Sequence, residues 1–214
     1  MEAVSHDARH RYDRWSMWYD WLAAAGEKRI QMAGIDLLKT QAPASVLDLG
    51  CGTGTAMLRL YGQLQGVKVI GVDISGGMLH KAASKLSSCE SGGRVRLVQG
   101  DAIHVPLRDH QIDAVFLSFT LELFSDEDIP AVLGEVGRVC RKDGCVLLVS
   151  MADSRQETLV LRIYRWLHAR FPDWIDCRPI HLEDYLRSEG FYVQQTERHQ
   201  IAGLPVDVML ATMD

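Results

Sequence analysis

The sequence predicts an α/β fold in which helices cover both faces of a mostly parallel sheet. Between residues 44 and 150, apolar strand patterns alternate with helical patterns, which is the order of βαβ units. A turn with three glycines joins the first of these strands to the next helix, as in doubly wound sheets that bind a ligand. The 214 residues are 47% hydrophobic, which is enough apolar material for the core of one domain.

The expected elements follow one another closely along the chain. Helical patterns occupy about 7–23 and 26–40, before the first strand. Strands are expected at 44–49, 67–73, 94–99, 111–118 and 144–150, and the helices between them at 54–63, 77–88 and 126–141. Two further helices at 155–171 and 181–189 precede a final strand pair at 190–200 and 204–213. Ser125 with Asp128 three residues later is typical of a helix start, and Gly144 is typical of a helix end.

The glycine turn predicts a site for a small, partly anionic ligand. Residues 46–54 have the sequence VLDLGCGTG, and the helix after them points unpaired N–H groups at the turn. The G-x-G-x-x-G spacing of a dinucleotide site is absent from this turn, which disfavours NAD and FAD. No Lys-Ser or Lys-Thr pair closes the turn, so an ATP-binding loop is disfavoured as well.

The segment VLDLGCGTG resembles the first motif of class I S-adenosylmethionine (SAM) dependent methyltransferases. The resemblance extends over about residues 44–151 and implies SAM as the cofactor. It also implies a single Rossmann-like, doubly wound domain with seven strands, of which the last is antiparallel. Along the chain, the implied parts are a helical cap (1–43), a cofactor core (44–151), substrate-wall helices (152–189) and the final strand pair (190–214).

The resemblance assigns cofactor roles to residues at the ends of four expected strands. Asp73, 19 residues after Gly54, is the expected ribose ligand, and Asp101 with Ala102 is expected at the adenine edge. The full expected set is Tyr19, Asp48, Gly50, Cys51, Gly52, Gly54, Asp73, Ile74, Met78, Asp101, Ala102 and Ser118. Each motif alone could be an ordinary turn or helix cap. Together, they follow the rule that open α/β sheets bind ligands beyond the carboxyl ends of their strands.

Candidate proton acceptors are Glu122, after the fourth strand, and His199, in the last strand pair. His104 is a weaker candidate for the same role. The alternatives are an exposed loop carboxylate for Glu122 and ordinary hydrogen-bonded histidines. Methyl transfer from a sulfonium can also proceed by alignment alone, without a base.

The substrate class follows from two further segments. The expected site floor, Leu117 to Thr120, lacks the Asn/Asp-Pro-Pro-Tyr/Phe sequence of many amine methyltransferases, which favours a small molecule. The aromatic-rich residues 11–21 resemble the start of ubiquinone/menaquinone C-methyltransferases and of bacterial phospholipid N-methyltransferases, although they could simply pack as one helix face. We therefore expect methyl transfer to oxygen or carbon of an aromatic or quinone-like acceptor. The alternatives are a lipid amine N-methyltransferase and a non-catalytic SAM-binding protein.

Charge and residue usage limit the partners. The net charge of −5 argues against a nucleic-acid surface. Five cysteines without C-x-x-C spacing are typical of free thiols, so no metal site is expected. No leader or membrane-spanning pattern is evident, which predicts a cytoplasmic protein. The basic helix expected at 155–171 could touch a membrane interface, but we favour the alternative, in which its apolar face packs on the sheet and its arginines are solvated. The oligomeric state is not predicted.

Overall fold

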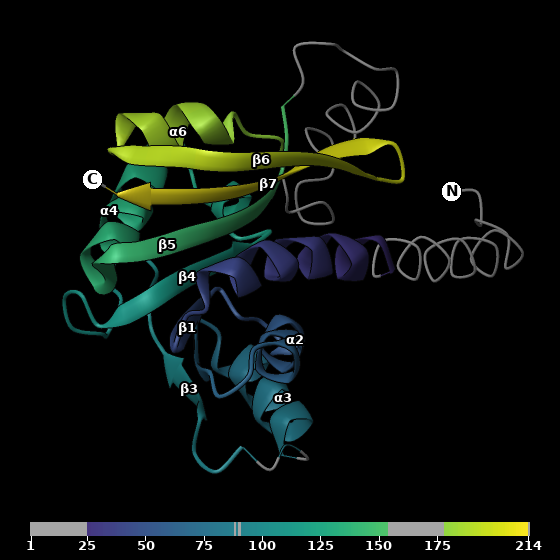
Figure 1. The fold of residues 1–214 in the computed structure, drawn as a ribbon, viewed down its shortest axis with the longest axis vertical. Coiled ribbons are helices and arrows are strands. Elements are labelled where there is room, and N and C mark those ends of the chain that lie inside the picture. Colours follow the sequence, from purple (N-terminus) through teal and green to yellow (C-terminus); the bar gives the residue numbers. More distant parts are fainter. Residues whose placement is uncertain (1–24, 88, 90, 154–177, 214) are drawn as a thin grey trace, which may run out of the picture.

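The computed structural model describes residues 25–87, 89, 91–153 and 178–213 and shows one seven-stranded sheet (Figure 1). The strand order is β3-β2-β1-β4-β5-β7-β6. The strands are β1 (Ser45–Leu49), β2 (Lys68–Asp73), β3 (Val95–Gln99), β4 (Ile112–Ser118), β5 (Cys140–Met151), β6 (Phe191–Ile201) and β7 (Leu204–Met213). The expected fold class, a doubly wound and mostly parallel sheet, is therefore confirmed.

Only β7 runs opposite to all the other strands of the sheet. The strand β1 pairs in parallel with β2 on one side and with β4 on the other, whereas β7 is antiparallel to both β5 and β6. After β3 the chain crosses back over β2 and β1 to form β4, so the strand order reverses between β1 and β4. At such a switch point the loops beyond the carboxyl ends of the strands diverge and leave a crevice.

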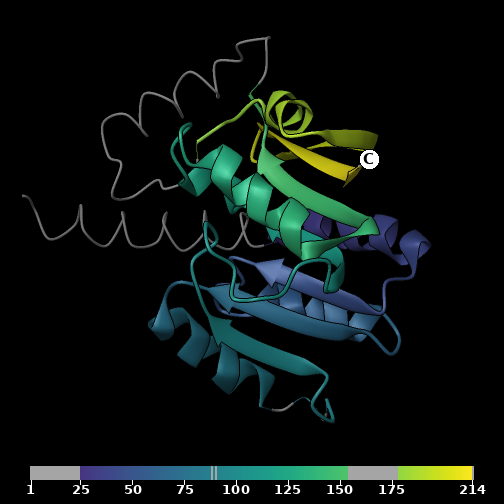
Figure 2. The same cartoon turned by 90° about the vertical axis from the view of Figure 1, so that its left-hand side faces the viewer.

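Helices cover both faces of the sheet (Figures 1 and 2). The helix over residues 25–41 packs on one face together with α2 (Thr55–Gln63) and α3 (Gly76–Leu86). The opposite face is covered by α4 (Ile129–Val139) and α6 (Leu182–Ser188). The short 3₁₀ helix η1 (Leu121–Leu123) follows β4 at the crevice.

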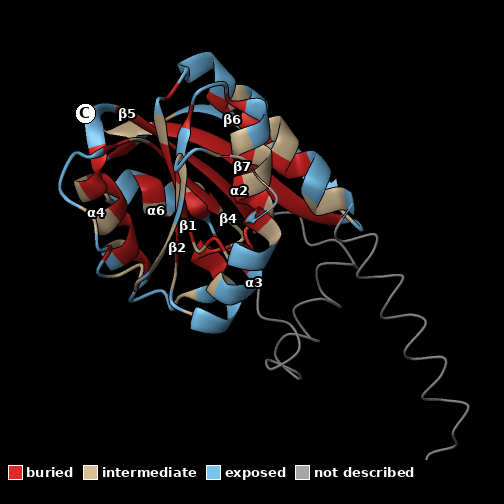
Figure 3. Cartoon of the chain, turned by 90° about the horizontal axis from the view of Figure 1, so that it is seen from below, coloured by how far each residue is buried: buried red, intermediate tan, exposed pale blue. Residues whose placement is uncertain are grey.

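Burial explains why the central strands are almost continuously apolar. In β4, Ala114 and Phe116 face the first helix layer, and Val115 and Leu117 face the second. All four are fully buried or nearly so, and the central strands are coloured as buried in Figure 3. A parallel sheet covered on both faces has this pattern because neither face meets water.

The expected boundaries around α4 and β5 were partly wrong. The helix begins after Asp128. The Asp128 N–H donates a hydrogen bond to Ser125 Oγ (3.2 Å) and so belongs to a turn that precedes the helix. It ends at Val139, and β5 already begins at Cys140, so Gly144 lies inside a strand and does not end the helix. A Cβ at Gly144 would stand 2.6 Å from the carbonyl oxygen of Asp113, so this glycine is needed for the close approach of β4.

The other expected elements lie within a few residues of the observed ones. The helices expected at 7–23 and 155–171 lie outside the described residues. Among the helices of the described part, none is long and apolar enough to span a membrane.

Candidate functional site

The turn after β1 has the backbone that its three glycines predict. Gly50, Gly52 and Gly54 have φ angles of 77°, 52° and 73°, in the left-handed region where other residues are strained. A Cβ on Gly50 would lie 2.5 Å from Cγ2 of Thr120, so the loop after β4 presses against this position. A Cβ on Gly52 would meet no atom within 4 Å, so the turn is open on its outer side.

Asp73, at the end of β2, is bonded to the same turn. Its Oδ2 accepts the N–H of Gly52 (2.8 Å), and its Oδ1 accepts the N–H of Ser75 (2.8 Å). A carboxylate can accept about four hydrogen bonds, so both oxygens keep capacity for a ligand hydroxyl. The residue expected to bind ribose therefore also holds the glycine turn in place.

A cavity of about 460 Å³ opens beside Asp73 and is lined mainly by apolar groups. We call it the apolar cavity. Its lining consists of Leu49, Gly50, Gly52, Val72, Asp73, Ile74, Ser75, Met78, Gly100, Asp101, Ala102, Phe119, Thr120, Leu123 and Phe124. Ile74 is 68% exposed and Leu123 is 55% exposed, so the lining of this cavity includes exposed large apolar side chains. The expected residues Ile74, Met78, Asp101 and Ala102 are thus brought together here with Asp73.

A second cavity, of about 330 Å³, lies on the other side of Gly50 and Gly52 and is mainly polar. We call it the polar cavity. Its lining consists of Glu27, Gln31, Asp48, Gly50, Cys51, Gly52, Thr53, Thr55, Ala56, Arg59 and Ser118. The two cavities share Gly50 and Gly52, so they adjoin at the glycine turn, and we call them together the paired site.

One carboxylate oxygen of Asp48, in the lining of the polar cavity, has no hydrogen-bond partner. The residue is 1% exposed, and its Oδ2 is the one buried side-chain oxygen or nitrogen without a partner in the described part of the chain. Burial, and to a lesser degree the charge of Asp73, raise the pKa of the Asp48 carboxyl to about 7. A buried carboxylate is stabilised by a cation, so this group favours a positively charged ligand atom.

Three polar residues that no sequence motif had indicated complete this cavity. Gln31 donates from Nε2 to Glu27 Oε1 and to Ser118 Oγ, both at 2.8 Å, and its Oε1 accepts from Arg59. Burial lowers the pKa of Arg59, and the nearby Glu27 carboxylate opposes this shift. Glu27 and Gln31 are four residues apart and therefore share a helix face, but only the fold brings that face to β4 and α2.

The polar cavity is complementary to an amino-acid zwitterion. Asp48 offers an unpaired carboxylate oxygen for an ammonium, and Arg59 offers a guanidinium for a carboxylate. The apolar cavity next to it has the apolar walls and the carboxylates that suit a nucleoside. The residues present therefore fit a ligand that joins an adenosine to an amino acid, as SAM does.

Asp48→Asn is expected to stabilise the ligand-free protein relative to the wild type, and by more at pH 8 than at pH 5. Since the folded-state pKa is raised, the folded protein binds more protons than the unfolded chain between about pH 4 and pH 7. The wild type therefore loses stability as the pH rises through this window, and the neutral amide does not. Urea denaturation at both pH values measures the difference, and an equal offset at pH 5 and pH 8 would contradict the prediction.

Several expected site residues lie elsewhere. Glu122 is 1% exposed and is not among the residues that line either cavity. His199 lies on β6, at the edge of the sheet, with its Nε2 3.2 Å from Glu197 Oε2, and two strands separate β6 from β4. The exposed His104 forms a β-bridge with Asp101 but lines neither cavity.

The expected cofactor residues also include Gly54, Cys51 and Tyr19. Gly54 caps α2, and a Cβ there would lie 3.0 Å from Cβ of Ala82. Cys51 lines the polar cavity, and burial raises the pKa of its thiol to about 12, so it stays protonated. Tyr19 lies outside the described residues.

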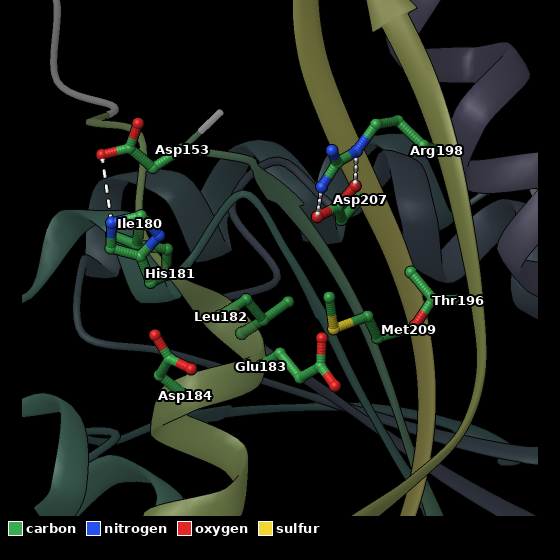
Figure 4. A pocket seen from close by; sticks show the side chains of 10 residues that line it. All are labelled: Asp153, Ile180, His181, Leu182, Glu183, Asp184, Thr196, Arg198, Asp207 and Met209. Carbon is green, nitrogen blue, oxygen red and sulfur yellow. Dashed lines mark hydrogen bonds and ion pairs between the residues drawn. The ribbon is translucent and has the colours of Figure 1, made fainter. Parts of the chain in front are cut away.

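A separate cavity of about 500 Å³ lies between α6 and the β6–β7 pair (Figure 4). Arg198 and Asp207 point toward each other there and form two hydrogen bonds, at 2.7 and 2.8 Å, and His181 pairs with Asp153 at 3.5 Å. No cluster of His, Cys, Asp and Glu within the described ranges could hold a metal ion.

Comparison with known proteins agrees with this geometry. A family model described as a methyltransferase domain matches residues 46–144, which include the glycine turn, Asp73 and Asp101. The chain is similar in structure to magnesium protoporphyrin IX methyltransferase from Synechocystis PCC 6803, solved with bound SAH, S-adenosylhomocysteine. The TM-score is 0.74 at 19% identity, over 96% of this chain and 95% of that one. These similarities support a class I SAM-dependent methyltransferase.

Two sequence relatives indicate which kinds of methyltransferase this chain resembles. The chain is 32% identical to the demethylmenaquinone methyltransferase of Lactiplantibacillus plantarum over 157 residues, which are 73% of this chain and 63% of the relative. It is also 32% identical to a malonyl-[acyl-carrier protein] O-methyltransferase of Methylovorus sp. over 190 residues, 86% of this chain and 62% of the relative. The resemblance to the ubiquinone/menaquinone type is thus confirmed, and the chain spans less than two thirds of the length of these relatives.

Proposed function

We propose that this protein transfers the methyl group of SAM to oxygen or carbon of a small aromatic or quinone-like acceptor. The observation that carries the proposal is the paired site, in which Asp48 and Arg59 suit the two charges of an amino acid. The names of the relatives, a demethylmenaquinone methyltransferase and an O-methyltransferase, support transfer to carbon or oxygen.

The proposed cofactor orientation follows from the two cavities. Asp73, Ile74, Met78, Asp101 and Ala102 would bind adenosine in the apolar cavity. In the polar cavity, Asp48 would accept from the ammonium, and Arg59 would donate to the carboxylate. When bound, SAM supplies a methyl group that its sulfonium has already activated.

The contribution of the protein itself is then mainly alignment and exclusion of water. Gln31 already donates to Ser118 Oγ, so the Ser118 hydroxyl proton remains free to donate toward a group in the polar cavity. Phe119 and Leu123 add apolar surface to the lining of the apolar cavity. With a net charge of −5, we propose a small-molecule substrate and no nucleic-acid partner, and we propose a cytoplasmic location.

Radiolabelled SAM, offered with a demethylmenaquinol, a catechol or phosphatidylethanolamine, tests the acceptor class. We expect label in the quinol or the catechol, attached to carbon or oxygen. Label in the phospholipid amine would favour the N-methyltransferase alternative. SAM binding without transfer to any of the three acceptors would favour a non-catalytic role.

A further inference from the structure

The loop between β4 and α4 forms one wall of the apolar cavity. Its residues Phe119, Thr120, Leu123 and Phe124 line that cavity. Phe119 has a φ of 52°, a conformation that a bulky residue keeps only when its surroundings enforce it. The wall therefore depends on contacts on its side away from the apolar cavity.

Glu122 makes such contacts from within the loop. Its Oε1 accepts the N–H of Met151 (3.1 Å), and its Oε2 accepts the hydroxyl of Ser150 (3.2 Å), both at the carboxyl end of β5. Glu122 and Ser150 are both buried. A substrate that enters either cavity would thus not meet this carboxylate, because it points away from the cavities toward β5.

Arg178 holds the same loop from the other side. Its Nη2 donates to the carbonyl oxygen of Phe124 (2.9 Å) and to Asp126 Oδ1 (2.6 Å). The hydroxyl of Tyr185, on α6, donates to the same Asp126 oxygen. The loop is consequently fastened to β5 by Glu122 and to the segment leading into α6 by Arg178.

We propose that Glu122 is a positioning residue, which fixes the wall formed by residues 119–124 and thereby sets how tightly the apolar cavity closes on an adenosine group. The identity of that group rests on the proposed function. The wall position does not, since the hydrogen bonds to Ser150 and Met151 exist without a ligand. Glu122 therefore acts through Leu123 and Phe124, and it takes no proton from the acceptor.

Two substitutions of similar size separate positioning from proton transfer. In Glu122→Gln, the amide oxygen can accept the Met151 N–H and the amide nitrogen can donate to Ser150 Oγ. Ser150 can then turn its own proton toward the Met151 carbonyl oxygen, 3.5 Å away. Glu122→Met keeps the length of the side chain and loses both hydrogen bonds. A positioning role predicts that Gln rescues function, whereas a general base would lose about 10²–10⁴-fold in rate in both variants.

The test compares the wild type, Glu122→Gln and Glu122→Met without and with ligand. Calorimetry with SAH and with 5′-methylthioadenosine should show about ten-fold weaker binding of both ligands to the Met variant, because two buried groups lose their partner. The Gln variant should bind within about two-fold of the wild type. Amide hydrogen exchange without ligand should be faster at residues 119–124 in the Met variant alone, with β1 and β2 unchanged.

The outcomes distinguish a failure of the positioning role of Glu122 from a failure of the proposed function. A Gln variant as weak as the Met variant, or a Met variant that behaves as the wild type, would overturn the positioning role. If the wild type bound neither ligand, the proposed function would fail, and hydrogen exchange at residues 119–124 would still decide the role of Glu122. Should Glu122→Met not fold, Ser150→Ala removes one of the two hydrogen bonds. It should then show the same changes to a smaller degree, and wild-type behaviour there would count against the proposal.

Discussion

Asp73→Ala is expected to weaken SAM binding by roughly 1–3 kcal/mol, which is about 5-fold to 150-fold in affinity. Two causes act together. The proposed ribose hydroxyls lose their acceptor, and the N–H groups of Gly52 and Ser75 lose theirs, so the glycine turn is no longer held against β2. Isothermal titration calorimetry on the folded variant measures the effect.

Asp36→Ala is a suitable control for this variant. Asp36 is an exposed carboxylate on the helix 25–41, and its ion pair is with Lys39 on the same helix (2.8 Å). An exposed pair of this kind contributes little to stability, and it lies outside both cavities. We expect unchanged SAM affinity in Asp36→Ala. Unchanged affinity in a folded Asp73→Ala protein would refute the assignment of Asp73.

Gly50→Ala is expected to lower the free energy of unfolding by about 2–5 kcal/mol, the sum of backbone strain and overpacking. The φ of 77° is unfavourable for alanine, and the added Cβ would stand 2.5 Å from Thr120 Cγ2 and 2.7 Å from its Oγ1. Thr120 is buried and bonded to the Leu49 carbonyl oxygen (3.2 Å), so it can give way only by moving the wall of the apolar cavity. SAM affinity should fall as well.

Gly66→Ala separates the backbone strain of a positive φ from the steric clash with Thr120. Gly66 has a φ of 73°, but a Cβ there would meet nothing within 4 Å. We expect this variant to lose only about 1–2 kcal/mol of stability, the cost of the left-handed conformation, and to bind SAM normally. Urea denaturation of both variants gives the comparison. Equal destabilisation by the two substitutions would show that the contact between Gly50 and Thr120 is not tight.

The part of the site that the sequence could predict is local. The glycine turn, Asp73 and Asp101 are linked to strand ends by short, fixed spacings, and the backbone of a βαβ unit then brings them to one edge of the sheet. Those residues line the two cavities or hold their turn. The same locality explains why the order of strands and helices could be predicted from residue patterns alone.

The part that the sequence could not predict depends on contacts between distant segments. Gln31 bonds to Arg59 and to Ser118 only after the first helix packs over β4 and α2. Glu122 has the sequence context of an exposed loop carboxylate, and only the partners on β5 show that it is buried. Gly144 is required by a carbonyl group of the neighbouring strand, which no local pattern reports.

A titration of the wild type with SAH, 5′-methylthioadenosine and NAD tests most directly whether the paired cavities form a SAM site. We predict one SAH bound per chain, at least about ten-fold more tightly than 5′-methylthioadenosine, because the latter lacks the amino acid that Asp48 and Arg59 would bind. NAD should bind weakly or not at all. Equal affinity for SAH and 5′-methylthioadenosine would contradict the role of the polar cavity, and tight binding of NAD without SAH would contradict the cofactor itself.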